Sequence, residues 1–105
     1  MEIVINNKRY NLIVANSFFK RLKGLMFQKE IKQGLFLPKT NSIHTFLMKD
    51  MIDIIMIDKE DNIVYLEKKV KKNKIIIKKK AYHTIELPKN TICNLNIGDK
   101  LTIIR

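Results

Sequence analysis

Cysteine and glycine are both scarce in this chain of 105 residues, which contains one cysteine and three glycines. The single cysteine, Cys93, excludes a disulfide within the chain and favours a reducing compartment, so we expect a cytoplasmic protein. Three glycines are too few for a phosphate-binding loop or a dinucleotide-binding fingerprint, because both depend on glycine-rich turns. Cys93 is flanked by apolar residues at alternate positions in "TICNLNI", and we therefore expect a small buried side chain there rather than a nucleophile.

Long apolar runs and compact metal-binding motifs are also missing. No stretch approaches the roughly 20 apolar residues that cross a bilayer, which predicts a chain without a membrane span. The first ten residues, "MEIVINNKRY", have an acid where a signal peptide has positive charge, and they contain no apolar signal-peptide core. No pair of cysteines or histidines has the spacing of a metal site, so we expect neither a metal nor a cofactor. The hydrophobic fraction of 46% and the length suit a single folded domain over residues 1–105.

The excess positive charge is concentrated in one segment. The formal net charge is +11, and "KKVKKNKIIIKKK" (68–80) contributes eight lysines and no acid, so that 11 − 8 leaves +3 for the remainder. This segment could bind nucleic acid or an anionic surface, since lysines neutralise phosphates. Lysine lacks the planar fork with which arginine binds phosphates and bases, and we favour a solvated loop over this alternative. The lysines of the nucleic-acid alternative are Lys68, Lys69, Lys71, Lys72, Lys78, Lys79 and Lys80.

Short β-rich runs separated by turn residues predict a mainly β (α+β) domain. "EIVI" and "YNLIV" flank Asn6-Asn7-Lys8-Arg9, which predicts a hairpin because asparagine tolerates positive φ. "IDIIMID" predicts a central strand buried on both faces, "IHTFLM" an extended segment, and "AYHTIEL" a half-buried strand. "NSFFKRLKG" and "QKEIKQG" predict one or two short helices. With seven to nine short strands in total, we expect a compact antiparallel barrel or curled sheet.

Several blocks in a fixed order resemble those of a known family. The blocks are Arg21…Gly24-Leu25-Met26, Gly34-Leu35-Phe36, Ser42-Ile43-His44-Thr45, Ile52-Asp53-Ile54, Ala81-Tyr82-His83, Ile85-Glu86-Leu87-Pro88 and Ile97-Gly98-Asp99. Together they are similar to the domain of unknown function 192 family of bacteria and archaea. The resemblance implies a fold and a set of motifs, but no reaction, because the family has no established biochemical function. This chain has Lys89-Asn90 where the family usually has Ala-Gly, and asparagine can keep the turn because it tolerates positive φ.

Polar side chains interrupt the most apolar segment of the chain, residues 41–58. A buried polar group that lacks a hydrogen bond costs about 1–3 kcal/mol, so each such group must bond to neighbouring backbone or line a site. For Asp53 we favour a carboxylate that accepts backbone N–H bonds, with a ligand contact as the alternative. For His44 we favour a structural histidine, and for Thr45 a locally bonded hydroxyl, again with ligand contacts as the alternatives.

The motif blocks suggest a small non-catalytic binding module with a pocket for a small anionic ligand or a peptide segment. Its predicted ligand-binding residues are Arg21, His44, Thr45, Asp53 and Glu86. Arginine suits bidentate binding of carboxylate or phosphate, although Arg21 could instead pair with a carboxylate of the chain such as Asp53 or Glu86.

Two other functions stay open beside this binding module. The first is the nucleic-acid or anionic-surface binding by residues 68–80 described above. The second is an enzyme that uses His44 and Asp53 as an acid–base pair, for which nothing in the sequence gives positive support. We favour binding over catalysis. We expect a monomer or weak homodimer, because Ile75, Ile76 and Ile77 form an apolar edge that neighbouring lysines guard.

Overall fold

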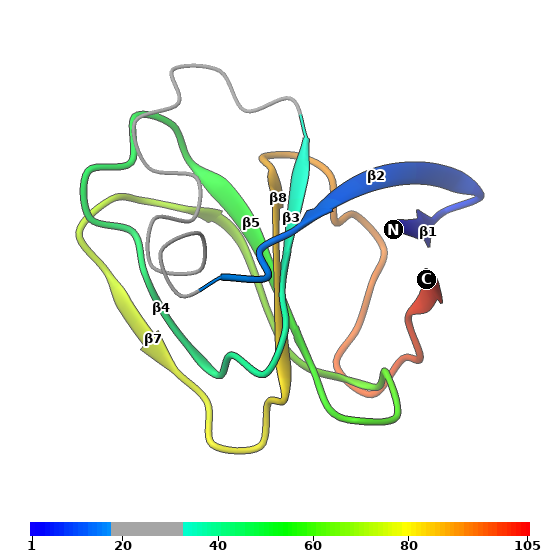
Figure 1. The fold of residues 1–105 in the computed structure, drawn as a ribbon. Coiled ribbons are helices and arrows are strands. Elements are labelled where there is room, and N and C mark those ends of the chain that lie inside the picture. Colours follow the sequence, from blue (N-terminus) through cyan, green and yellow to red (C-terminus); the bar gives the residue numbers. More distant parts are fainter. Residues whose placement is uncertain (18–32) are drawn as a thin grey trace.

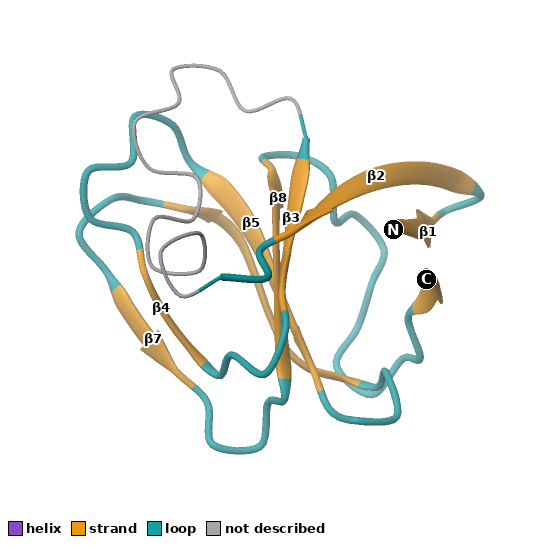
Figure 2. Cartoon of the chain, in the orientation of Figure 1, coloured by secondary structure: helices purple, strands orange, loops and turns teal. Residues whose placement is uncertain are grey.

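The structure is a computed structural model, and it describes residues 1–17 and 33–105 (Figures 1 and 2). Seven strands form one sheet in the order β6-β5-β8-β3-β2-β1-β9, and β4 and β7 form a separate two-stranded sheet. The prediction of a mainly β, curled-sheet fold is confirmed. The strands of the described residues are β1 (Glu2–Ile5), β2 (Lys8–Val14), β3 (Gly34–Leu37), β4 (Ser42–His44), β5 (Ile52–Ile57), β6 (Ile63–Val70), β7 (Ile75–Ile77), β8 (His83–Pro88) and β9 (Thr102–Ile104).

The predicted short helices over 16–24 and 28–34 fall almost entirely on residues 18–32, which lie outside the described residues. The predicted hairpin at the N-terminus is present: β1 and β2 pair in antiparallel register, from Ile5 opposite Lys8 to Glu2 opposite Asn11. Asn6 and Asn7 between them have φ values of 51° and 66°. Two consecutive residues at positive φ match the right-handed twist of a two-residue hairpin, which explains why asparagine occupies both positions.

Positive φ also explains the departure from the family pattern after β8. Asn90 has a φ of 68°, so it takes the conformation for which glycine would otherwise be favoured. The turn predicted to survive the change from Ala-Gly to Lys89-Asn90 is therefore present.

The seven-stranded sheet curls until its two ends meet. The first strand in the spatial order, β6, begins beside the segment that leads into the last strand, β9. The N–H of Ile63 donates to the carbonyl of Asp99 at 2.8 Å, and the N–H of Gly98 donates to the carbonyl of Ile63 at 2.8 Å. β9 then pairs with β1, so the two chain termini lie close together (Figure 1).

The curled sheet separates two hydrophobic cores. β5 is buried at all six positions because one of its faces lies in each core, which confirms the predicted central strand. The barrel core lies inside the curl and contains Ile3, Ile5, Leu12, Phe36, Ile55, Ile57, Ile63, Ile85, Leu87, Ile92 and Leu101. The outer core lies on the other face, under β4 and β7, and contains Ala15, Leu35, Leu37, Ile43, Met48, Ile52, Ile54, Met56, Val70, Ile76 and Ala81.

Gly34 allows three strands to approach closely where β3 begins. β3 pairs in parallel with β2 and in antiparallel with β8. A Cβ atom on Gly34 would lie 2.4 Å from Cδ2 of Leu12 and 2.7 Å from Cδ2 of Leu87, so no larger residue fits without movement. This requirement accounts for the glycine at the start of the Gly34-Leu35-Phe36 block.

Two predictions about strands are wrong. "IHTFLM" is extended only as far as His44, because residues 45–48 form a turn. In this turn the N–H of Met48 donates to the carbonyl of Thr45 at 3.3 Å, and Leu47 has a φ of 63°. β8 is not half-buried: Thr84 to Leu87 are all buried. The reason is its central place between β5 and β3, where the two cores cover both of its faces.

Candidate functional site

Asp53 ties three segments of the chain together. It is fully buried at the start of β5. One carboxylate oxygen accepts the N–H of Lys69 at 2.9 Å, and the other accepts the N–H groups of Thr91 at 2.8 Å and Ile92 at 3.0 Å. The favoured prediction for this residue, a carboxylate that accepts backbone N–H bonds, is confirmed.

Thr45 performs a similar role on the other side of the sheet. Its hydroxyl donates to the carbonyl of Lys71 at 2.7 Å and accepts the N–H of Lys74 at 2.9 Å, and its side chain is fully buried. Its own N–H donates to the carbonyl of Lys74 at 2.9 Å, and its carbonyl accepts the N–H of Asn73 at 3.2 Å. Thr45 therefore fixes the loop that joins β6 to β7. The prediction of a locally bonded hydroxyl is wrong, because the two hydrogen-bond partners of the hydroxyl lie 26 and 29 residues away along the sequence.

His44 is half-buried at the end of β4. Its Nδ1 accepts the N–H of Phe46 at 3.2 Å, and the two rings stack with centroids 5.2 Å apart and planes at 23°. Because Nδ1 accepts this bond, the neutral ring has its proton on Nε2. No hydrogen bond to Nε2 comes from the described residues.

Glu86 and Asp53 point to opposite faces of the sheet. Glu86 lies opposite Leu35 and Ile54, both of which belong to the outer core. Asp53 lies opposite Leu87, which belongs to the barrel core. Side chains that face each other across neighbouring strands share one face, so the two carboxylates are separated by the sheet itself. The structure therefore does not bring the Asp53 and Glu86 carboxylates together.

The same separation keeps His44 and Asp53 apart. β4 and β7 cover the outer-core face of the sheet, and the Asp53 carboxylate points to the barrel side. Arg21, the remaining predicted site residue, lies outside the described residues. Its predicted ligand contact stays a prediction.

The outer surface of the small sheet gathers exposed apolar side chains around His44. Ile43 and Ile76 pair across the two strands and point into the outer core, so their neighbours in the two strands point outward. We call this outward surface, together with the exposed turn residues that follow β4, the His44 face. It comprises His44, Phe46, Leu47, Ile75 and Ile77, of which the last four are 41%, 58%, 64% and 60% exposed.

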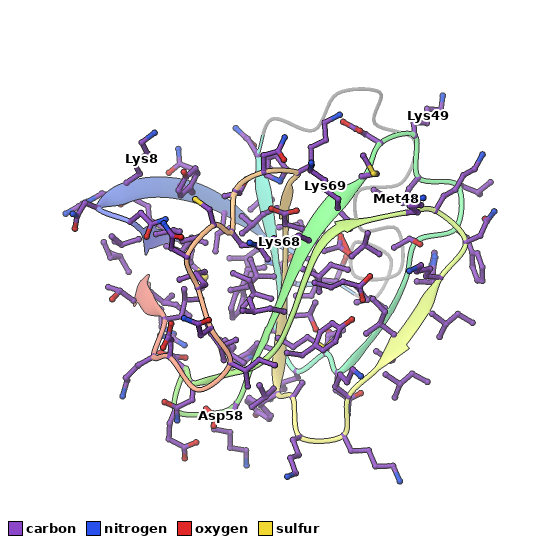
Figure 3. All side chains as sticks on the ribbon, turned by 180° about the vertical axis from the view of Figure 1, so that it is seen from behind. Lys8, Met48, Lys49, Asp58, Lys68 and Lys69 are labelled. Atoms are coloured by element: carbon purple, nitrogen blue, oxygen red, sulfur yellow. The ribbon has the colours of Figure 1, made fainter. Side chains whose placement is uncertain are left out.

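The lysine-rich segment borders this surface. Lys71 and Lys72 precede β7, Lys79 and Lys80 follow it, and all four are exposed. Figure 3 shows β7 on the opposite side of the molecule from Lys8. The segment is thus ordered around a strand, and it is continuous with the His44 face.

Two other lysines of the segment point back toward β6. Lys74 Nζ lies 3.6 Å from a carboxylate oxygen of Glu67, and Lys78 Nζ lies 4.5 Å from the centre of the Tyr65 ring. The Tyr65 hydroxyl donates to the Glu67 carboxylate. Burial raises the pKa of Tyr65, and the Glu67 carboxylate raises it further. This cluster fixes β7 against β6 and leaves the lysines at the two ends of β7 facing solvent.

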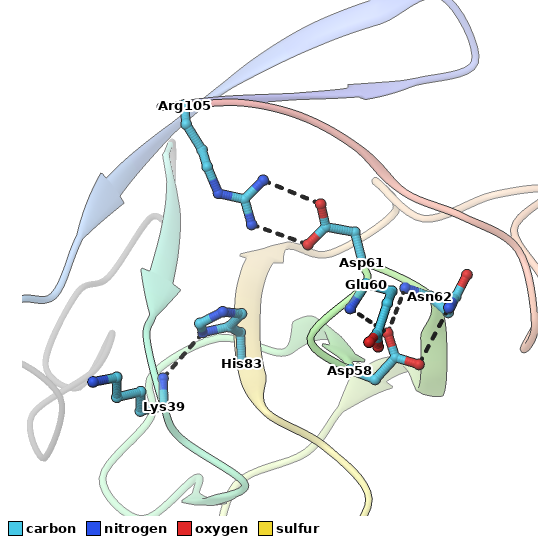
Figure 4. A network of polar contacts seen from close by, with 7 residues as sticks. All are labelled: Lys39, Asp58, Glu60, Asp61, Asn62, His83 and Arg105. Atoms are coloured by element: carbon cyan, nitrogen blue, oxygen red, sulfur yellow. Dashed lines mark hydrogen bonds and ion pairs between the residues drawn. The ribbon is translucent and has the colours of Figure 1, made fainter.

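Sequence reasoning missed a second polar cluster, around His83 (Figure 4). The N–H of Lys39 donates to Nδ1 of His83 at 3.0 Å, and the ring packs on Phe36 with centroids 4.9 Å apart. Arg105 binds both carboxylate oxygens of Asp61, at 3.0 and 3.1 Å. Burial lowers the pKa of His83, and the positive charge of Arg105 lowers it further. The Ala81-Tyr82-His83 block was the available signal. The hydrogen-bond partner of His83, Lys39, lies 44 residues away along the sequence, so only the fold brings the two together.

Cys93 is exposed, so the prediction of a buried cysteine is wrong. The prediction assumed strand alternation in "TICNLNI", but residues 91–97 form turns rather than a strand, and Asn94 has a φ of 63°. The Asn6 amide donates to the Cys93 carbonyl at 2.8 Å and to its sulfur at 3.3 Å.

Among the described residues, no three His, Cys, Asp or Glu side chains lie together as metal ligands would.

The sequence profile of DUF192, described as an uncharacterized ACR, matches residues 1–103. The chain belongs to the DUF192 family. The UPF0127 protein of Thermococcus sibiricus is 34% identical over 96 residues, which cover 84% of this chain and 62% of that protein. The UPF0127 protein of Thermococcus kodakarensis is 33% identical over 92 residues, which cover 82% and 59%. This DUF192 chain therefore spans about three fifths of the length of these relatives.

Two crystal structures share the fold of this DUF192 member. A protein of unknown function from Novosphingobium aromaticivorans has a TM-score of 0.81 at 15% identity, over 97% of this chain and 82% of that one. A "putative transcription regulator" from Sinorhizobium meliloti has a TM-score of 0.80 at 16% identity, over 95% and 88%. At these identities the likeness shows the fold alone. In the part of the chain that the structure describes, no helix has the length and apolar character needed to span a membrane.

Proposed function

We propose that this DUF192 protein is a non-catalytic binding module and that the His44 face is its binding surface. The observation that supports this proposal is the gathering of four exposed apolar side chains around one half-buried imidazole. Contiguous apolar side chains on a surface typically mark a site of interaction. The imidazole adds a directed polar group, because its Nδ1 is bonded to the chain and its Nε2 is not bonded to any described residue.

Most other polar residues of the motif blocks support this surface rather than contact the partner. Thr45 holds the loop before β7, and Asp53 holds the end of β6 and the loop after β8. Both side chains are fully buried and their oxygens are bonded to backbone groups. We therefore propose a positioning role for Thr45 and Asp53, a contact role for His44, and we keep Arg21 and Glu86 as proposed contributors to ligand binding.

The partner of the His44 face is anionic. Residues 68–80 contain eight lysines and no acid, and the exposed ones border the apolar side chains. Such a distribution attracts negative charge and repels positive charge over about a Debye length. Binding is favoured over an acid–base reaction because His44 and Asp53 lie on different sides of the sheet.

Binding of labelled anionic probes tests the proposal. Fluorescence anisotropy at 50 mM salt would measure the affinity of an acidic peptide of alternating Glu and Leu, and of a single-stranded oligonucleotide. The face variant Ile75→Ser/Ile77→Ser should weaken binding, whereas Ile97→Ser should not. Ile97 is a matched control, since it is 64% exposed, as Ile75 is, but lies on a distant turn.

Two further variants test the motif residues. His44→Ala should stay folded by circular dichroism and bind more weakly, and Arg21→Ala should do the same if Arg21 contributes to the site. If both variants unfold, these residues are scaffold and the contact role fails. The whole proposal fails if no anionic probe binds, whether soluble or on a vesicle, or if the face variant binds every probe as well as the native protein does.

A further inference from the structure

We propose that the partner of the His44 face is the surface of an anionic lipid bilayer. This inference rests on the proposed function, because it names the partner of the same surface. It depends on two features found side by side on β7: aliphatic side chains that point into solvent, and exposed lysines at both ends of the strand. Each feature supplies one of the two attractions that hold a peripheral protein at a charged membrane.

The apolar part of the surface has the chemistry of a membrane-inserting patch. Leu47, Ile75 and Ile77 are purely aliphatic, and each is more than half exposed. Ile75 and Ile77 are two positions apart on one face of a strand, so their side chains lie about 7 Å apart and point the same way. Aliphatic groups gain nothing from phosphates or bases, but they gain free energy on entering the acyl-chain boundary of a bilayer.

The lysines frame this patch instead of interrupting it. Along β7, Lys74 and Lys78 share the inward side with Ile76, and they contact Glu67 and Tyr65. Lys71, Lys72, Lys79 and Lys80 belong to the turns at the two ends of β7, and no carboxylate of the described residues pairs with them. When Ile75 and Ile77 enter the bilayer boundary, these four lysines lie at the level of the lipid headgroups.

Two other occupants fit less well. A second copy of the chain would bring its own lysine-rich segment against this one, and like charges at close range oppose association. A nucleic acid would satisfy the lysines, but it would leave the isoleucines in water. The ring of Phe46 is already stacked on His44, so it offers no open platform for a base.

Cosedimentation with lipid vesicles tests the inference with the full chain. Vesicles of phosphatidylglycerol and phosphatidylcholine should bind the protein, and vesicles of phosphatidylcholine alone should not. Lys72→Gln/Lys79→Gln should lower the partition coefficient on the order of tenfold. Ile75→Ser/Ile77→Ser should lower it by a similar factor, and the binding that remains should be more sensitive to salt.

Matched controls separate the surface from overall charge and hydropathy. Lys8→Gln/Lys100→Gln removes the same charge away from β7, and Ile97→Ser removes an equally exposed isoleucine. Both controls should change the partition coefficient by less than about twofold, since membrane attraction decays within a Debye length.

The possible outcomes distinguish this inference from the proposed function. If the acidic peptide or the oligonucleotide binds through the His44 face and anionic vesicles do not, the lipid inference is overturned and the binding function stands. The lipid inference is also overturned if the protein binds neutral and anionic vesicles equally. It is overturned as well if the control variants lower the partition coefficient as much as the variants on β7 and in its flanking turns do. If neither vesicles nor soluble probes bind, both proposals fail together.

Discussion

Asp53 offers the most direct test of how the chain holds its loops. Its carboxylate accepts three backbone N–H groups from two segments. Lys69 lies at the register shift between β5 and β6, and Thr91 and Ile92 follow β8. Hydrogen bonds to a charged group contribute about 1.5–3 kcal/mol each, and a buried donor left without a partner costs about 1–3 kcal/mol. Asp53→Asn keeps one accepting oxygen but turns an NH₂ group toward N–H donors. We therefore expect the free energy of unfolding to fall by about 3 kcal/mol, a large part of the 5–15 kcal/mol typical of a domain.

Urea unfolding at pH 7, followed by circular dichroism, measures this loss. Asp50→Asn is the control, since the Asp50 carboxylate accepts one backbone N–H, from Met51 at 2.8 Å, and contacts Lys89 Nζ at 3.1 Å near the surface. We expect a clearly smaller cost there. Amide hydrogen exchange should become faster at Thr91 and Ile92 in the Asp53 variant. Equal costs for the two variants, with unchanged exchange, would refute the assignment of Asp53 as the tie between these loops.

Three further predictions concern the fold around the site. Thr45→Val removes both hydroxyl bonds to the loop before β7, so unfolding free energy should fall by about 2 kcal/mol and exchange at residues 71–74 should accelerate. Gly34→Ala places a methyl group 2.4 Å from Leu12, and thermal unfolding should show a loss of about 1–3 kcal/mol. The lowered pKa of His83 means that the unfolded chain takes up this proton at higher pH than the folded one, so stability should fall as pH drops from 7 to 5. His83→Gln should remove this part of the pH dependence.

Each of these predictions has a result that contradicts it. Thr102→Val, at an exposed threonine of β9, is the control for Thr45, and equal effects would argue against a special role for the Thr45 hydroxyl. An unchanged melting temperature for Gly34→Ala would mean that the three strands separate easily. A stability slope between pH 7 and 5 that is the same in native protein and His83→Gln would show that protonation of His83 does not oppose folding.

The elements that could be predicted from the sequence are those with local causes. Two consecutive asparagines, which tolerate positive φ, predict the hairpin between β1 and β2. A β-branched apolar run predicts β5 as a central strand. The turn after His44 was not predictable in this way, because Leu47 takes a φ of 63° within a loop that Thr45 fixes to residues 71–74. A leucine in that conformation depends on tertiary contacts, which no local pattern reveals.

The candidate site could be predicted only in part, because strand register decides which side chains meet. Asp53 and Glu86 both belong to motif blocks. Neighbouring positions in a strand point to opposite faces of the sheet, so the sequence does not show whether the two side chains share a face. Only the pairing of β5 with β8 determines on which face each side chain lies. In the sequence, the lysine-rich segment and the His44 block are separate features. The pairing of His44 with Ile75 makes them one surface.

The central claim, that the His44 face binds an anionic membrane, can be tested by NMR with spin-labelled lipids. The ¹⁵N-labelled native chain would be mixed with phosphatidylglycerol-containing vesicles that carry a paramagnetic label at the headgroup. The account predicts the strongest broadening at the amides of Leu47, Ile75 and Ile77, and little at Ile97 or Lys8. Broadening centred on another surface, or spread evenly over the molecule, would contradict it.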